Sequence, residues 1–415
     1  MALVAVGVGG ALFAGVEVRA RQEARTLSER ARSLLHANTT AAPELQHLQA
    51  DRARMFVDEA LGLHESDELR GLRHLTSALS YLQKGDRGRA LQRLDMAEGL
   101  LGESADSLAL RGALEAVAGR RRSAKRLARR ALGRDPKHLR ARVLLVDASL
   151  DEADAERALT LLNSLVREGE DSAALHNRRG IALETLGRLA AAEAAFDTAV
   201  RRDGRLSDGH LNRGRVLRAR GQAERALAAF LNAARLDPTS SAAVVGAALC
   251  RLELGDRVGA VADLERAHAM GDGDSQALLV LGDLDVVEGD LARAIVRFRA
   301  AIALAPERAH AYLKLGNALM RAGDFGEAAG AFERAIDRDG SASAAHNGLG
   351  AALSALGRRE EAALSLARAA DLDRSDPNPW LNLARLHQQG GDLDQARQAL
   401  AAARQRDPEV MLAGL

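Results

Sequence analysis

The amino-acid sequence predicts an all-α protein, a solenoid built from stacked helical hairpins. A pattern 34 residues long recurs along the chain and places glycine and alanine at fixed positions. Each copy holds two amphipathic stretches, separated by a glycine in all copies but one, which is the pattern of a short helical hairpin. Aromatic residues make up only 2% of the 415-residue chain, which argues against a large β domain. One hairpin cannot bury its apolar stripe alone, so we expect the copies to stack.

The clearest copy of the pattern is residues 309–342. Its first helix is expected at about residues 309–321, and Gly323 can end it because glycine tolerates a left-handed conformation. Asp324 follows, and its carboxylate can accept a backbone N–H bond at the start of the second helix. That helix is expected at about residues 326–337.

The chain begins with an apolar stretch, residues 2–16, that carries no charge. As a helix it would span about 22 Å, which is shorter than the roughly 30 Å hydrocarbon core of a bilayer. Three interpretations stay open: a membrane anchor over residues 1–18, which we favour, a signal peptide, and a buried or disordered helix. Five arginines in the following helix favour the cytoplasmic side for the rest of the chain, although bacterial proteins of this build often face the periplasm.

Two further helices are expected before the first copy, at residues 17–35 and 44–63, with a break at residues 38–43. They do not match the recurring pattern at its key positions. We therefore expect residues 19–70 to form a spacer and a cap over the first hairpin.

Ten copies then run without a gap through residues 71–408, and residues 409–415 remain as a tail. The twentieth position is alanine in all ten copies, and the fifteenth is glycine in nine, with Ala153 as the exception. The third copy is the most divergent. The copies begin at residues 71, 105, 139, 173, 207, 241, 275, 309, 343 and 377.

This pattern resembles the tetratricopeptide repeat (TPR), with a large residue at position 4, a small one at 8, alanine at 20 and 27, an aromatic residue or leucine at 24, and proline at 32. The resemblance covers about residues 71–408, and only Trp380 supplies the tryptophan that the family favours at position 4. It implies a right-handed superhelix whose first helices line a concave groove. It also implies a scaffold without catalysis of its own that binds partner proteins in that groove.

In several TPR families, asparagine in the groove holds the backbone of an extended peptide, because an amide both donates and accepts hydrogen bonds. Nearby arginine and lysine can receive carboxylates from an acidic partner. The frequency of asparagine in the repeat and of arginine in this chain explains the same residues without a ligand. The two-carboxylate clamp of the chaperone-binding TPR proteins is not found. The candidate groove residues are Asn177, Arg178, Asn212, Arg215, Arg218, Lys314, Asn317, Arg321, Asn347, Asn382 and Arg385.

A basic run covers residues 119–142, where Asp135 is the only acidic residue. It falls on the turn and second helix of one copy, which is the convex side or the edge. Anionic lipid or nucleic acid can bind such a patch. Nucleic acid is disfavoured because no aromatic residue offers a base a stacking surface, and an ordinary solvated helix face is the plainer interpretation. The candidate patch residues are Arg120, Arg121, Arg122, Lys125, Arg126, Arg129 and Arg130.

No catalytic motif is present: the chain has no P-loop, no G-x-S-x-G, no H-E-x-x-H and no dinucleotide fingerprint. The single Cys250 excludes a disulfide framework and a cysteine-based zinc site, so we expect no metal and no cofactor. A net charge of +1 implies no whole-chain attraction to nucleic acid. The expected partners are proteins, with an extended or acidic segment, and self-association stays open. The alternative function is a regulatory or substrate-presenting subunit of an enzyme assembly.

Overall fold

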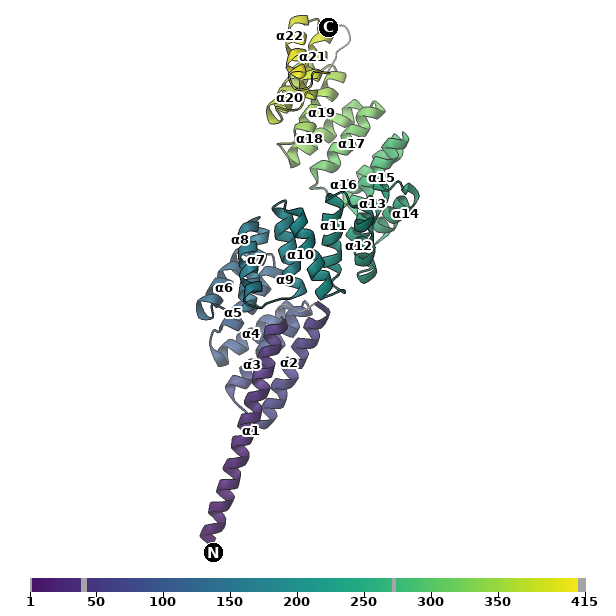
Figure 1. Cartoon of the computed structure of the whole chain (residues 1–415). Coiled ribbons are helices and arrows are strands. Elements are labelled where there is room, and N and C mark those ends of the chain that lie inside the picture. The colour runs from purple at the N-terminus through teal and green to yellow at the C-terminus, as the bar shows by residue number, and fades with distance from the viewer. Residues whose placement is uncertain (1, 39–42, 271–273, 410–415) are drawn as a thin grey trace. The chain divides into compact units, whose positions relative to one another are not determined.

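The structure is a computed structural model, and it describes residues 2–38, 43–270 and 274–409; side chains are described for residues 17–35, 48–270 and 274–409. The described residues form α-helices joined by short turns, with no strand among them (Figure 1). The chain divides into two compact regions, which we call the N-terminal region (Met1–Asp237) and the C-terminal region (Pro238–Leu415). The all-α fold is therefore confirmed.

The N-terminal region consists of a long first helix, its partner and five helical hairpins. The helices are α1 (Ala2–Asn38), α2 (Pro43–Leu63), α3 (Asp67–Gln83), α4 (Arg87–Leu101), α5 (Ala105–Val117), α6 (Arg121–Arg134), α7 (Leu139–Asp151), α8 (Ala155–Arg167), α9 (Ala173–Thr185), α10 (Leu189–Arg202), α11 (Ser207–Ala219) and α12 (Ala223–Leu236).

The C-terminal region consists of five further hairpins. The helices are α13 (Ser241–Glu253), α14 (Arg257–Ala269), α15 (Ser275–Glu288), α16 (Leu291–Leu304), α17 (Ala309–Ala322), α18 (Phe325–Arg338), α19 (Ser343–Ala355), α20 (Arg359–Leu372), α21 (Asn378–Gln389) and α22 (Leu393–Arg404).

In five of the hairpins a large side chain of the second helix packs on a glycine of the first. Phe332, at position 24 of its copy, is fully buried against Gly316 at position 8. A Cβ atom added to Gly316 would lie 2.6 Å from the ring, so only glycine fits there. Phe196 contacts Gly180 in the same way. The recurring small and large positions are thus the two sides of one contact, and burying each phenylalanine contributes roughly 2–3 kcal/mol.

The turn of the clearest copy agrees with the sequence in one respect and differs in another. Gly323 has φ 86°, the left-handed conformation that ends α17. Asp324 takes the N-cap position of α18, but its side chain accepts no backbone hydrogen bond, so the predicted carboxylate cap is wrong. Asp290, with nearly the same backbone angles, does accept one from Arg293 N at 3.0 Å. The difference therefore lies in the rotation of the Asp324 side chain.

Within each region the first helices of successive hairpins contact one another, with α13 and α15 as the exception, whereas successive second helices of the described residues are farther apart. A stack with this spacing curves toward its first helices. The odd-numbered helices α3 to α21 therefore line the concave face of their own region, as the family resemblance implies.

The helices α1 and α2 pack on the first hairpin. Ala31, Val57 and Leu72, from three successive helices, share one buried cluster, and Arg32 Nη2 lies 2.5 Å from Glu68 Oε1 on α3. The side chains of residues 2–16, where the anchor is predicted, lie outside the described residues. Among the residues that are described, none of the helices combines the length and apolarity needed to cross a bilayer.

Candidate functional site

The concave face of the N-terminal region carries three of the predicted groove residues in one hydrogen-bonded arrangement. Asn212 Nδ2 on α11 donates to Asn177 Oδ1 on α9 at 3.1 Å. Arg215 Nη1, one turn further along α11, donates to Asn212 Oδ1 at 3.2 Å. We call these residues the N-terminal triad.

The C-terminal region repeats this arrangement. Asn382 Nδ2 on α21 donates to Asn347 Oδ1 on α19 at 2.9 Å, and Arg385 Nη1 donates to Asn382 Oδ1 at 3.4 Å. We call these residues the C-terminal triad. Both triads use position 5 of one copy and positions 6 and 9 of the next, so the stacking of two copies brings their members together.

Each triad leaves hydrogen-bond donors unused. An asparagine amide has two N–H donors and one acceptor oxygen. Within the described part of the chain, the amide nitrogens of Asn177 and Asn347 donate to no other group, and Asn212 and Asn382 use one N–H each. The mutual bonds fix the orientation of the amides, and the remaining N–H donors make no hydrogen bond within the described residues.

The two triads differ in how their charge is compensated. Arg215 Nη2 binds Glu184 Oε1 at 2.8 Å, and Asn212 is only 7% exposed. At the position equivalent to Glu184, the C-terminal triad has Ser354, whose hydroxyl lies 3.5 Å from Gln389 Oε1. Arg385 is exposed, and no carboxylate in the described residues pairs with it.

Arg178, next to the N-terminal triad, is also compensated. Its guanidinium binds both oxygens of Asp147 on α7, at 2.6 and 3.1 Å. Burial lowers the pKa of Arg178, but the charge and hydrogen bonds of Asp147 outweigh it, so the pKa is raised. Arg178 is held in place for packing on α7 and has little freedom to meet a ligand.

Three predicted groove residues of α17 lie apart from the triads. Lys314 Nζ binds both oxygens of Asp283 at 2.8 Å, and Arg321 Nη1 donates to the carbonyl of Val286 at 3.3 Å. Asn317 is exposed on the same helix, and Arg218 lies partly buried on α11.

The acidic partners of these cations are neighbours of the candidate site that the sequence prediction missed. Asp147, Glu184 and Asp283 each precede their cation by 31 residues, which is one repeat less one helical turn. Opposite charges at this spacing are the sequence signal that would have found them.

Carboxylates from neighbouring helices and turns pair with several cations of the basic run. Arg120, Arg121, Lys125 and Arg130 form ion pairs with Glu115, Asp151, Glu152 and Glu103 respectively. Four of the seven predicted patch residues therefore already have a carboxylate partner. Arg122, Arg126 and Arg129 remain on α6 without an ion pair among the described residues, beside a hollow of about 480 Å³.

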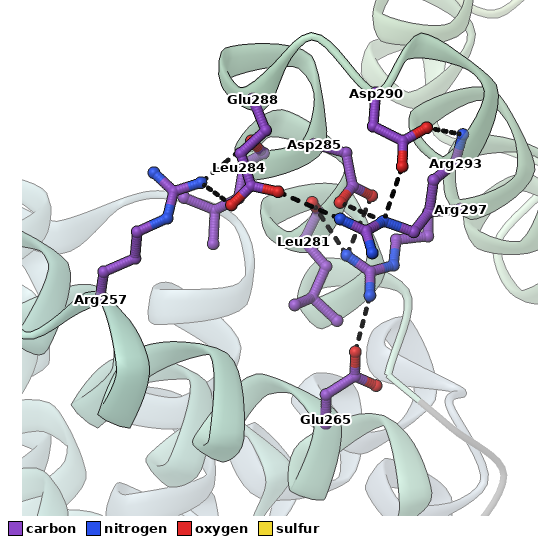
Figure 2. Close-up of polar contacts among 9 residues, drawn as sticks. All are labelled: Arg257, Glu265, Leu281, Leu284, Asp285, Glu288, Asp290, Arg293 and Arg297. Atoms are coloured by element: carbon purple, nitrogen blue, oxygen red, sulfur yellow. Dashed lines mark hydrogen bonds and ion pairs between the residues drawn. The ribbon is translucent and has the colours of Figure 1, made fainter.

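A buried carboxylate joins three helices of the C-terminal region. Figure 2 shows Asp285 on α15, which is 1% exposed, between Arg293 Nε at 2.8 Å and Arg297 Nη1 at 2.9 Å on α16. Arg297 also reaches Glu265 on α14 at 2.7 Å. The hydrogen bond from Arg293 to Asp285 raises the pKa of Arg293. Since every charge in the network has a partner, it serves to hold the hairpins together.

The preceding copy carries the same pair with the charges exchanged. Arg251 and Asp263 lie 3.0 Å apart at positions 11 and 23, the positions of Asp285 and Arg297. In the described part of the chain, no cluster of histidine, cysteine and carboxylates has the geometry of a metal site, and Cys250 is buried.

Three family models match the chain. Residues 118–180 and 211–276 match models described as the tetratricopeptide repeat, and residues 257–413 match the model of the cilia and flagella-associated protein 70 C-terminal domain. No curated protein sequence matches the chain.

The fold is similar to solved solenoids. A chain of the crystal structure of the APC/C hetero-tetramer Cut9–Hcn1 is 18% identical, with a TM-score of 0.51, covering 86% of this chain and 74% of that one. Yeast Tom70 is 15% identical, with a TM-score of 0.46 and 92% of both chains covered. The repeat matches and the stacked hairpins lead to one conclusion, which is that the chain is a tetratricopeptide-repeat protein.

Proposed function

We propose that this protein is a scaffold, without catalysis of its own, that holds an extended segment of a partner protein on its concave face. The proposal rests on the repeated triad: the same asparagine–asparagine–arginine arrangement is built in both regions, with amide donors unused. Such N–H groups can donate hydrogen bonds to the carbonyl oxygens of a peptide backbone, whatever the side chains of that peptide are.

The chemistry of the C-terminal triad favours an acidic segment. Arg385 has no carboxylate partner among the described residues, so a glutamate or aspartate of the bound segment supplies the missing charge. Each hydrogen bond to the segment contributes roughly 0.5–1.5 kcal/mol net, so useful affinity requires several contacts along the groove.

The test compares wild-type protein with the double variant Asn347→Ala/Asn382→Ala in crosslinking and mass spectrometry of cell extracts. Changing both asparagines avoids leaving one amide without its partner. The control is Asn163→Ala, on the second helix α8. We expect recovery of partner proteins to fall in the double variant and to stay at the wild-type level in the control. Equal recovery from all three proteins contradicts the proposal.

The same experiment separates the alternative function. If one enzyme is recovered in a fixed ratio with this chain, the protein is a regulatory or substrate-presenting subunit of that enzyme's assembly. If several unrelated proteins are recovered and share an acidic extended segment, the general scaffold is supported.

Attachment to a membrane, with the repeats on the cytoplasmic side, is a separate prediction from the apolar residues 2–16. The test is fractionation of cells that express either the full chain or a variant that lacks residues 1–18. We expect the full chain with the membranes and the deletion in the supernatant. Finding the full chain in the supernatant contradicts the tether and leaves the groove proposal intact.

A second candidate activity is binding of anionic lipid by Arg122, Arg126 and Arg129, which is favoured by their lack of ion pairs and by the hollow beside them. Replacing all three by glutamate should abolish binding to phosphatidylserine vesicles. Replacing the paired Arg120, Arg121 and Arg130 is the matched control, with a smaller loss expected. Unchanged vesicle binding in the first variant excludes this activity.

A further inference from the structure

A hollow of about 390 Å³ opens between α16, α17 and α18 in the C-terminal region. Ile302, Tyr312, Leu315 and Leu319 form most of its apolar lining. The candidate groove residues of α17, which are Lys314, Asn317 and Arg321, do not line it. Since two of its three walls are second helices, the hollow is a different surface from the concave groove.

Gly330 lines one wall of the hollow and places no side chain there. Gly330 lies in the interior of α18, where glycine weakens a helix relative to alanine. Packing does not require glycine here, because a Cβ atom added at Gly330 would meet nothing within 4 Å, whereas one at Gly316 would strike Phe332. The neighbouring copies carry Val296 and Leu364 at the same position, so the helix accepts a side chain there.

The rim of the hollow is positively charged. Arg299 on α16 pairs with Glu327 on α18, and these two charges cancel. Arg334, one turn beyond Gly330 on α18, is exposed and has no ion pair among the described residues. An apolar lining with one unpaired guanidinium at its edge complements an apolar group that has a carboxylate beside it.

We propose that this hollow binds one large apolar side chain of a partner protein, flanked in the partner's sequence by an acidic residue. The apolar side chain enters between α16 and α18 over Leu315, and the carboxylate pairs with Arg334. The surface gives the scaffold a second point of attachment that does not depend on the groove.

The probe is a fluorescein-labelled, amidated pentapeptide with phenylalanine at its centre and glutamate on both sides, and its binding is followed by fluorescence polarisation. The variant Gly330→Met fills the hollow without removing a native contact. The control Gly326→Met lies on the same helix, where an added Cβ atom also meets nothing within 4 Å, but Gly326 does not line the hollow. Circular dichroism confirms that both variants fold.

We expect Gly330→Met to weaken binding about tenfold and Gly326→Met to leave it unchanged. Arg334→Glu should weaken binding of the glutamate peptide. It should strengthen binding of a peptide that has lysine on both sides of phenylalanine. The proposal is overturned if Gly330→Met binds like wild type, if alanine replaces phenylalanine without loss, or if wild type shows no binding at about 1 mM protein. The glycine variants leave both triads unchanged. If probe binding survives in Gly330→Met but falls in Asn347→Ala/Asn382→Ala, the probe binds in the groove and not in the hollow.

Discussion

The N-terminal and C-terminal triads have the same geometry and different surroundings. In the N-terminal triad, Glu184 neutralises Arg215 and Asn212 is buried, so the triad is closed by the protein itself. In the C-terminal triad, Ser354 replaces the glutamate and Arg385 stays exposed without a carboxylate. The comparison indicates that the repeat fixes where the amides lie. We expect the residue at position 12 to decide whether the arginine is neutralised inside the protein, by Glu184, or is left for an external charge, as beside Ser354.

The largest expected effect concerns stability. Asn212→Ala removes a buried amide together with its hydrogen bonds to Asn177 and Arg215, so we expect the N-terminal triad to lose about 2 kcal/mol of local stability. The equivalent Asn382→Ala lies in a more open site and should cost only about 0.5 kcal/mol. Native-state hydrogen exchange of α11 and α21 measures both, since repeat arrays do not always unfold in two states. Equal losses of local stability in the two variants would show that the triads are equally open to solvent.

Exchanging the residues at position 12 is the next effect in size. Ser354→Glu should pair with Arg385 and weaken an acidic segment about tenfold, which is about 1.4 kcal/mol. Glu184→Ser should strengthen binding of the same segment at the N-terminal triad by a smaller factor, because Asn212 remains buried. Titration calorimetry with a poly-glutamate decamer measures both changes. The comparison fails if Ser354→Glu leaves the affinity unchanged.

The smallest effect is a difference in acid sensitivity beside the two triads. His176 Nε2 lies 2.7 Å from Asp171 Oδ1, whereas the equivalent His346 contacts the carbonyl of Gly340 at 3.3 Å. The hydrogen bond with His176, and the charge of Arg202, lower the pKa of Asp171. Asp171 therefore stabilises the fold at pH values above its unfolded pKa, and this contribution is lost as the pH falls through the lower, folded pKa.

Hydrogen exchange of α9 and α19 between pH 5 and about pH 2 checks this sign. We expect α9 to lose protection more steeply than α19 as the pH falls, and Asp171→Asn to remove the excess. A steeper loss in α19 would contradict the assignment.

The periodic features of the fold were predictable from the sequence because each depends on contacts inside one copy. Gly323 ends its helix, and Gly316 faces Phe332, for reasons that a single hairpin contains. The N-cap of Asp324 was predicted wrongly because an N-cap position does not fix the rotation of the side chain.

Contacts between copies were harder to predict. The repeat predicted the asparagines as groove residues. It did not predict that asparagines 35 residues apart would form hydrogen-bonded pairs. The ion pairs within the basic run were not predicted, because Glu103 and Glu152, which pair with Arg130 and Lys125, come from outside α6. The hollow beside Gly330 could not be predicted from the sequence. A glycine that packing requires and a glycine that leaves open space cannot be distinguished in the sequence alone.

The central claim is that partners lie on the concave face, and photo-crosslinking tests it most directly. A benzophenone amino acid is placed at Asn317, which is exposed on α17, or at Leu364, which is 73% exposed on the second helix α20. After irradiation in cells, we predict crosslinked partner proteins from position 317 and few from position 364. Crosslinks of equal yield from both positions, or from position 364 alone, would contradict the account.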